Sequence, residues 1–164
     1  MKLEIERYID ISIAEQRLAV LEMGEISQTF PVSTAKKGAG QRKGSECTPL
    51  GWHCIRAKIG GNAVINSVFV GRRATGEIYT PQLAVAEPDR DWILSRILWL
   101  GGLEAGINRY GDVDTSWRYI YIHGSPDDTV LAGPASHGCI RMLNSDVITL
   151  YNWVNVGCRV FIHE

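Results

Sequence analysis

The most informative stretch of this sequence is Ser136-His137-Gly138-Cys139-Ile140-Arg141, which follows shortly after the pair His123-Gly124. A cysteine is a good nucleophile only as the thiolate, and near neutral pH it needs an imidazole or another cation nearby to lose its proton. Gly138 carries no side chain beside the sulfur, so that a substrate carbonyl and backbone N–H donors can meet there. These residue types are the ones that a cysteine acyl-transfer site needs.

The residues around the two motifs predict that both lie at strand ends. Residues 117–122 alternate between apolar and polar side chains, which predicts a strand ending at His123. Residues 139–142 predict a second short strand after a turn, and in an extended stretch Cys139 and Arg141 point to the same face. We therefore expect Cys139 to be the nucleophile and His123 its base, and we expect this pairing to lower the pKa of the thiol.

The two motifs together closely resemble the signature of the YkuD-type L,D-transpeptidase family. That signature is a His-Gly pair, a short variable loop, then Ser or Thr, His-Gly-Cys, a hydrophobic residue, and Asn or Arg; every position is filled here, with Arg141 last. The resemblance continues over nearly the whole chain, through residues 8–20, 30–34, 48–51 and 144–160. It implies one mainly β catalytic domain with few helices and a β-sandwich or barrel-like fold, spanning residues 1–164.

The resemblance also implies a reaction. The family's usual donor is a peptidoglycan tetrapeptide stem, in which the nucleophile attacks the carbonyl between a diamino acid and the terminal D-Ala and forms a thioester. An amine acceptor then gives a cross-link, whereas water gives a tripeptide. By the same resemblance, a backbone carbonyl orients the imidazole of His123, and carbapenems acylate Cys139.

The other residues of the motif have expected roles in shaping the site. We expect the backbone N–H groups of residues 137–139 to stabilise the oxyanion. Ser136 is expected to hold the turn locally together with Gly138. For His137 we favour a structural role in the same turn over a place in the wall of the site.

Several residues are candidates for substrate contacts. Arg141 could bind a carboxylate in bidentate fashion, and the alternative is a surface arginine paired with an acid such as Asp146. Gly124 is a further candidate. Residues 101–116 predict a mobile lid that brings Arg109 and Tyr110 to the substrate, and a plain surface loop is the alternative.

Composition limits the class of protein. The chain has 164 residues, of which 45% are hydrophobic and 21% charged, as in a soluble single domain. Its formal net charge of −1 argues against nucleic-acid binding. The first residues contain no apolar stretch of the ~7–15 residues that a secretory signal needs, and we expect no membrane insertion.

We therefore expect a cytoplasmic protein, and with the family resemblance an L,D-carboxypeptidase of muropeptide recycling. The alternative is a periplasmic L,D-transpeptidase whose export signal was removed. The oligomeric state, the diamino acid and the presence of sugar or nucleotide on the substrate stay open.

The pattern of residues also predicts secondary structure. Strands are expected at 5–13, 17–23, 26–32 and 158–162, and a loop at 35–46. Gly60-Gly61-Asn62 predicts a hairpin turn between strands at 51–59 and 63–70. Helices are expected to begin at caps Asp91 and Asn144, the first with Ile93, Leu94, Ile97 and Leu98 on one face and an end at Gly101-Gly102.

Two other functional classes deserve comparison. A zinc site could use His123, His137 and Cys139, but no fourth ligand is indicated and Gly138-Cys139 fits acyl transfer better, so we expect no metal and no cofactor. A non-catalytic wall-binding module could stack sugars on Trp52, Trp92, Trp99, Trp117 and Trp153. The cysteines are neither dense nor evenly spaced and predict no disulfide framework, although Cys47 and Cys54 could bridge.

Overall fold

The alternating apolar residues near the start of the chain form the three antiparallel strands expected there. The computed structural model describes residues 7–164, in which β1 (Arg7–Ser12), β2 (Arg17–Glu22) and β3 (Glu25–Ser33) follow one another. Ile9 and Ile11 on β1 have no exposed surface, so the alternation places one face of this meander in the core. Residues 5 and 6 of the expected first strand lie outside the described part.

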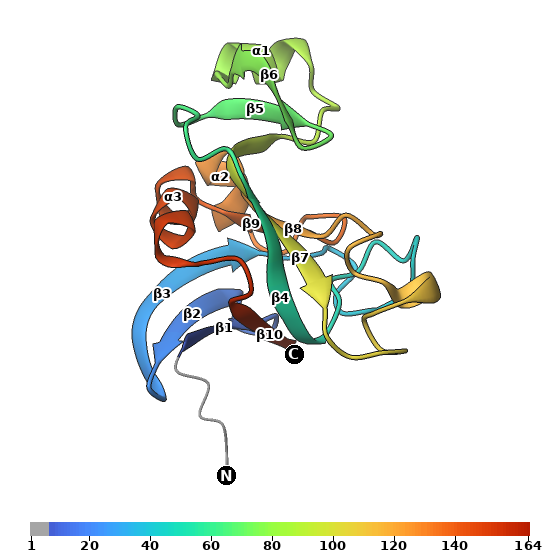
Figure 1. Ribbon diagram of the computed structural model, residues 1–164. Helices are drawn as coiled ribbons and strands as arrows, with labels where there is room; N and C mark the ends of the chain where they lie inside the picture. Colours follow the sequence, from blue (N-terminus) through green and yellow to red (C-terminus); the bar gives the residue numbers. More distant parts are fainter. Residues whose placement is uncertain (1–6) are drawn as a thin grey trace.

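The strands of the described chain belong to one ten-stranded sheet that closes on itself (Figure 1). The order is β4-β10-β1-β2-β3-β9-β8-β7-β5-β6, and an additional pairing of β4 with β7 joins eight of the strands into a barrel-like ring. The remaining strands are β4 (Gly51–Ile59), β5 (Ser67–Val70), β6 (Arg73–Ile78), β7 (Ile93–Gly102), β8 (Tyr121–Gly124), β9 (Ile140–Met142) and β10 (Arg159–His163). The fold class expected from the sequence is confirmed.

The main core lies inside this ring. It is built from aliphatic side chains of β1 to β4, β7 to β10 and the helix α3 (Asn144–Trp153). Ile55, Leu98, Ile122 and Ile140, which come from four different strands, are all completely buried. Because these strands converge on one core, the catalytic motifs on β8 and β9 rest on a well-packed scaffold.

The helix expected from Asp91 to Gly102 is wrong, because these residues form the central strand β7. β7 pairs with β4, β5 and β8, and seven of its ten residues are buried, whereas Ile93, Trp99 and Gly102 are partly exposed.

 Because side chains alternate along a strand, the seven buried residues of β7 lie on both of its faces. A strand buried on both sides reads as a continuous apolar run, and such a run contains helical spacings by chance.

The hairpin expected at Gly60-Gly61-Asn62 is also wrong. A turn does form there, closed by a hydrogen bond of 3.0 Å from the Ala63 N–H to the Gly60 carbonyl, but β4 and β5 do not pair. β4 continues the ring beside β7 and β10, whereas β5 pairs with β6 and β7. The predicted turn therefore forms, but the two strands beside it pair with strands that are distant in the sequence and not with each other.

The segment from β5 to the start of β7 stands out from one end of the ring (Figure 1). It contains β6 and the helix α1 (Pro81–Ala86), neither of which was predicted. Thr80 caps α1 by accepting a hydrogen bond of 3.1 Å from the Leu83 N–H, and Pro81 occupies the first turn. The Thr80-Pro81 pair is thus a helix-start signal that the sequence contained.

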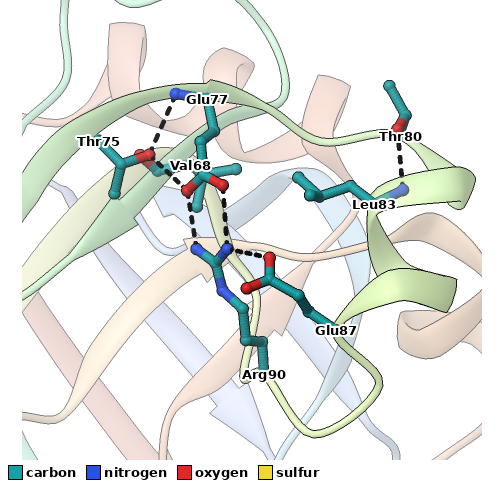
Figure 2. Close-up of polar contacts among 7 residues, drawn as sticks. All are labelled: Val68, Thr75, Glu77, Thr80, Leu83, Glu87 and Arg90. Carbon is teal, nitrogen blue, oxygen red and sulfur yellow. Dashed lines mark hydrogen bonds and ion pairs between the residues drawn. The ribbon is translucent and has the colours of Figure 1, made fainter.

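Arg90 links β6 to the residues that follow α1 within this segment, as Figure 2 shows. Its guanidinium donates two hydrogen bonds to Glu77 on β6, of 2.9 and 3.0 Å, and one of 2.6 Å to Glu87 after α1. Arg90 also stacks on an aromatic ring, with its guanidinium carbon 4.4 Å from the centre of the Trp92 ring. The strand, the helix and the start of β7 are therefore held together around one side chain.

The C-terminal part follows the expected order of helix and strand, with one correction. α3 begins at Asn144, but Leu143 occupies the cap position. The Asn144 side chain instead donates to the Ser125 carbonyl (2.8 Å) and accepts from the Ser95 hydroxyl (2.6 Å). The short helix α2 (Asp127–Leu131), between β8 and β9, was not predicted. Within residues 7–164, every helix is too short or too polar to cross a bilayer.

Candidate active site

Parallel pairing of β8 with β9 brings the two sequence motifs together. Ile122 pairs with Ile140 and His123 with Arg141, so the end of one motif lies beside the end of the other. The strand that carries His123 begins at Tyr121, not at residue 117, because residues 115–119 form a turn. His123, Cys139 and Arg141 all line one cavity of about 430 Å³.

The sulfur of Cys139 is held by the backbone of the segment before β8. The Tyr121 N–H donates to Sγ at 3.3 Å, and the thiol donates to the Tyr119 carbonyl at 3.4 Å. The first contact favours the thiolate and the second favours the neutral thiol. The half-buried side chain is therefore fixed in position before any substrate arrives.

The imidazole of His123 is oriented by a neighbouring carbonyl group. Its Nδ1 lies 2.7 Å from the Gly124 carbonyl oxygen, which can only accept a hydrogen bond. Nδ1 therefore carries the hydrogen, and Nε2 presents a lone pair that can accept a proton. The side chain is almost completely buried, with 1% of its surface exposed.

Burial shifts the pKa values of both groups toward their neutral forms. It raises the pKa of the Cys139 thiol to about 12, although the Tyr121 N–H opposes the shift. Burial also lowers the pKa of His123, against the bond to Gly124. The expected low-pKa thiolate is thus corrected to a neutral thiol beside a neutral imidazole, because removal of both groups from water outweighs their local hydrogen bonds.

The turn before Cys139 is held by Ser136 and requires Gly138. The Ser136 hydroxyl donates to the Cys139 carbonyl at 2.6 Å and accepts from the Gly138 N–H at 3.2 Å. Gly138 has a φ of +133°, and a Cβ there would lie 2.9 Å from the Ile120 side chain. Because the Gly138 N–H is used within the turn, the N–H groups of His137 and Cys139 are the remaining oxyanion candidates of this stretch.

His137 has a different place from the structural one that we favoured. Its side chain is exposed and lines the catalytic cavity as well as two neighbouring hollows, of about 330 and 400 Å³. Ser136 supplies the side-chain hydrogen bonds of the turn instead. His137 is therefore part of the wall of the site.

Arg141 combines both alternatives considered from the sequence. Its guanidinium forms an ion pair of 2.9 Å with Asp91, and not with Asp146, and 9% of the residue's surface is exposed. Asp91 and Arg141 together line the catalytic cavity and the adjoining 330 Å³ hollow. The ion pair holds a cation in the cavity wall, two positions after the nucleophile.

Gly124, a candidate for substrate contact from the sequence, has a packing role in the structure. It is buried in β8, and a Cβ there would lie 2.5 Å from the Leu94 carbonyl oxygen and 2.6 Å from Asn144 Oδ1. Its own carbonyl accepts the hydrogen bond from His123. Close packing against β7 and α3 therefore requires a glycine, and the residue positions the base.

Arg109 and Tyr110 lie apart from the nucleophile, in the wall of a separate hollow of about 380 Å³. The segment that carries them is anchored through Asn108, which is fully buried and donates to the carbonyls of Leu50 and Trp52, each at 3.0 Å. A lid movement of residues 101–116 stays a prediction. A lid movement would either break the hydrogen bonds of Asn108 to Leu50 and Trp52 or leave Asn108 in place.

Seven further residues of the cavity wall were missed from the sequence, namely Gly71, Arg72, Asp91, Ile93, Arg118, Tyr119 and Tyr121. Arg118 binds three backbone carbonyls of the 40–47 loop, including that of Cys47 at 2.6 Å, and so holds the loop against the site. No local pattern marks these residues, because their positions follow from the strand order. Among residues 7–164, no three His, Cys, Asp or Glu side chains are grouped to hold a metal ion.

Comparison with known proteins agrees with this geometry. The family model of the YkuD L,D-transpeptidase catalytic domain matches residues 6–162. A comparison with curated proteins finds no match.

Solved structures show the same fold at low sequence identity. An L,D-transpeptidase from Mycobacterium smegmatis is 18% identical, with a TM-score of 0.61 over 97% of this chain and 59% of that one. One from Xylanimonas cellulosilytica is 19% identical, with a TM-score of 0.57 over 99% and 63%. L,D-transpeptidase 3 from Mycobacterium tuberculosis, solved with a faropenem-derived adduct, is 17% identical, with a TM-score of 0.59 over 97% and 60%. The chain thus spans about three fifths of these proteins. The family match over nearly its whole length shows that the chain belongs to the YkuD L,D-transpeptidase catalytic domain family.

Proposed function

We propose that this chain is a cysteine acyltransferase acting on peptidoglycan tetrapeptide stems, and that it works mainly as an L,D-carboxypeptidase. The observation that carries the proposal is the meeting of Cys139, His123 and Arg141 in one cavity, with the free nitrogen of the imidazole available as a base. A nucleophile, a base oriented by a third group, and a cation for a carboxylate are the parts that such a reaction needs.

The neutral ground state suits a reaction in which proton transfer accompanies attack. His123 Nε2 takes the thiol proton as Sγ of Cys139 attacks the carbonyl carbon between the diamino acid and D-Ala. The resulting oxyanion would be bound by the N–H groups of His137 and Cys139. The imidazolium then gives its proton to the departing amine, D-Ala leaves, and a thioester remains.

The second half-reaction needs an acceptor, and the charge of the cavity favours water. Three arginines, Arg72, Arg118 and Arg141, line it together with a single carboxylate, that of Asp91. An amine acceptor near neutral pH approaches as an ammonium ion, which such a cavity repels, whereas water is neutral. His123 then takes a proton from the water that attacks the thioester carbonyl and returns it to the departing Cys139 sulfur, so that the C–S bond breaks and the tripeptide is released. Cross-linking by a periplasmic enzyme is the alternative.

A reducing compartment is part of the proposal. All four cysteines, Cys47, Cys54, Cys139 and Cys158, are free thiols in the structure. Free thiols are typical of cytoplasmic proteins, whereas disulfides persist in oxidising compartments. Fractionation of native cells tests this, since we expect the protein among the soluble cytoplasmic proteins. Recovery from the periplasm would overturn this part of the proposal.

The decisive experiment is the substitution Cys139→Ala. We expect it to abolish D-Ala release from a tetrapeptide, because no other group in the cavity can form the thioester, while the circular dichroism spectrum stays unchanged. Cys47→Ala, Cys54→Ala and Cys158→Ala serve as matched controls and should keep most of the activity. Mass spectrometry of the products, with an acceptor stem added, should show mainly tripeptide.

Two results would contradict the proposal in different ways. Full activity of Cys139→Ala would exclude the cysteine mechanism. A cross-linked dimer as the main product would keep the mechanism and replace hydrolysis with transpeptidation.

A further inference from the structure

Arginine and aromatic side chains alternate along one surface that leads away from the catalytic cavity. We call this surface the aromatic–arginine strip and define it by Arg56, Arg72, Arg109, Tyr110, Trp117 and Tyr119. Among the described residues, the large aromatic side chains that are strongly exposed are Trp117 (62%), Tyr110 (59%) and Tyr119 (46%). All of them lie in the strip, although exposed aromatic groups are costly and usually mark a binding surface.

The strip is continuous with the site of the reaction. Arg72 and Tyr119 line the catalytic cavity, and the Arg72 guanidinium carbon lies 5.1 Å from the centre of the Tyr119 ring. Behind them, Trp99 on β7 has Arg72 and Arg56 each at 4.7 Å from its ring centre. Arg56 is in turn 6.0 Å from the ring of Trp117.

The outer end of the strip is a hollow of its own. Arg56 and Trp117 line the 380 Å³ hollow together with Arg109 and Tyr110, and the last two stack at 4.7 Å. The strip therefore begins beside the nucleophile and ends in a second concave surface.

The positive charges of the strip are not neutralised by carboxylates of the described residues. In the part of the chain that the structure describes, Arg56, Arg72 and Arg109 form no ion pair with a carboxylate. Stacking on aromatic rings leaves N–H donors at the edge of a guanidinium for an anion, and Arg72 uses one of its donors in a hydrogen bond of 2.9 Å to the Tyr121 hydroxyl. Rings for stacking and guanidinium groups for anions together fit a ligand that carries both ring systems and negative charge.

We propose that the aromatic–arginine strip binds the sugar end of the substrate, a pyranose ring that is joined to the N-terminus of the stem peptide and can carry an anionic diphosphate. This inference rests on the proposed function, in which the nucleophile cuts at the C-terminal end of the same stem. The residues between the cut and the sugar, about three in an extended chain, span about 10 Å. The separations between the guanidinium groups of Arg56 and Arg72 and the rings beside them, including the underlying Trp99, are 4.7 to 6.0 Å, so that a few neighbouring groups cover that reach.

Two sources could supply this chemistry, namely a wall fragment that carries sugar alone and a precursor whose sugar carries a nucleotide diphosphate. The test uses three probes with one tetrapeptide: the free peptide, muramoyl tetrapeptide, and muramoyl tetrapeptide linked to uridine diphosphate. D-Ala release gives KM and kcat for the full chain and for the variants Trp117→Ala and Arg56→Ala. The matched control is Arg73→Ala, which removes an exposed arginine beside the strip.

We expect the sugar-bearing probes to have a KM lower than that of the free peptide by roughly tenfold. Trp117→Ala and Arg56→Ala should remove this advantage with kcat unchanged, while the free peptide and Arg73→Ala stay as in the original chain. A full gain with muramoyl tetrapeptide assigns the strip to the sugar, and a gain with the nucleotide-linked probe alone assigns it to the diphosphate and base.

Equal KM values for the three probes, or an equal loss for all three in the variants, would overturn the inference and leave the proposed function standing. Titration of the same probes into Cys139→Ala, followed by tryptophan fluorescence, tests binding without turnover. If no probe is cleaved, the proposed function fails. The strip is then judged by this titration alone, where a sugar-dependent affinity that Trp117→Ala removes supports it and equal affinities overturn it.

Discussion

Single residues of the site show that its nucleophile is stored in the neutral form. His123 lies on β8 and Cys139 directly precedes the adjacent strand β9; desolvation lowers the pKa of His123 and raises that of Cys139, so that both groups favour their neutral forms in the free protein. The hydrogen bond from Tyr121 and the cations Arg118 and Arg141 lower the pKa of the thiol without overcoming burial. Substrate binding and attack therefore have to precede or accompany the transfer of the proton.

This neutral state predicts the pH dependence of Cys139 labelling. Because burial raises the pKa of Cys139 to about 12, we expect iodoacetamide to react slowly near pH 7 and the rate to keep rising above the pKa of about 8.5 of an ordinary cysteine. The rate of adduct formation on the Cys139 peptide, followed by mass spectrometry, measures it. A rate that levels off below the ordinary pKa would show instead that His123 holds a thiolate.

Arg141 gives the second prediction at this scale. Its ion pair with Asp91 places a guanidinium in the cavity wall, and a substrate carboxylate there gains a bidentate partner. Arg141→Ala should therefore raise KM for the tetrapeptide more than it lowers kcat. Arg141→Lys should keep part of the binding, since it keeps the charge and loses the fork. A loss confined to kcat would exclude the role in binding.

At the scale of elements, β4 contributes a buried histidine that ties the strand to the loop before β8. His53 is fully buried, with Nδ1 3.0 Å from the Gly51 carbonyl oxygen and Nε2 3.0 Å from the Thr115 hydroxyl. Burial lowers the pKa of His53 to about 4 from 6.5. The neutral ring thus fastens β4 to residues 103–120, the segment that also supplies Tyr119 to the site.

The shift at His53 predicts acid sensitivity. Between pH 6.5 and about 4 the unfolded chain binds a proton that the folded chain does not, so the free energy of unfolding falls as the pH is lowered through this window. Above pH 6.5 the ring of His53 is neutral in both the folded and the unfolded chain, so it causes no loss of stability there. A shift of this size corresponds to about 3 kcal/mol.

Urea unfolding at several pH values measures this slope. His53→Gln should flatten it, leaving the part that comes from other groups such as His123, whose pKa burial also lowers. An unchanged slope in His53→Gln would show that other groups cause the acid sensitivity.

At the scale of the whole molecule, closure of the ring depends on the last strand. β10 pairs in parallel with β1 and antiparallel with β4, and it carries the buried residues Val160 and Ile162. Without β10, the edges of β1 and β4 would be unpaired and the core would open to water. The site on β8 and β9 lies on the far side of this ring and relies on the same core.

We therefore expect a chain that ends at Gly157 to lose cooperative thermal unfolding. Removal of Glu164 alone, which is exposed, is the control and should leave the transition nearly unchanged. Circular dichroism during heating measures both. A cooperative transition in the shorter chain would mean that β10 is dispensable for the ring.

The sequence by itself determined the features that short stretches carry. The His123-Gly124 and Ser136–Arg141 motifs pointed to the family, and alternation in residues 7–22 predicted the first hairpin correctly. The closing helix and strand also followed from local periodicity. These features depend on neighbours in sequence, so their physical cause can be read from the residues themselves.

Only the tertiary structure decided the rest. β7 is a strand and not a helix because other strands cover it on both edges and the core covers its faces, and this environment overrides its helical spacing. Asp91 reaches Arg141, and Arg56 reaches Trp117, across separations in sequence that no local pattern records. The same burial that forms the site also keeps Cys139 and His123 neutral, because desolvation depends on everything that packs around a group and not on the residues beside it in the chain.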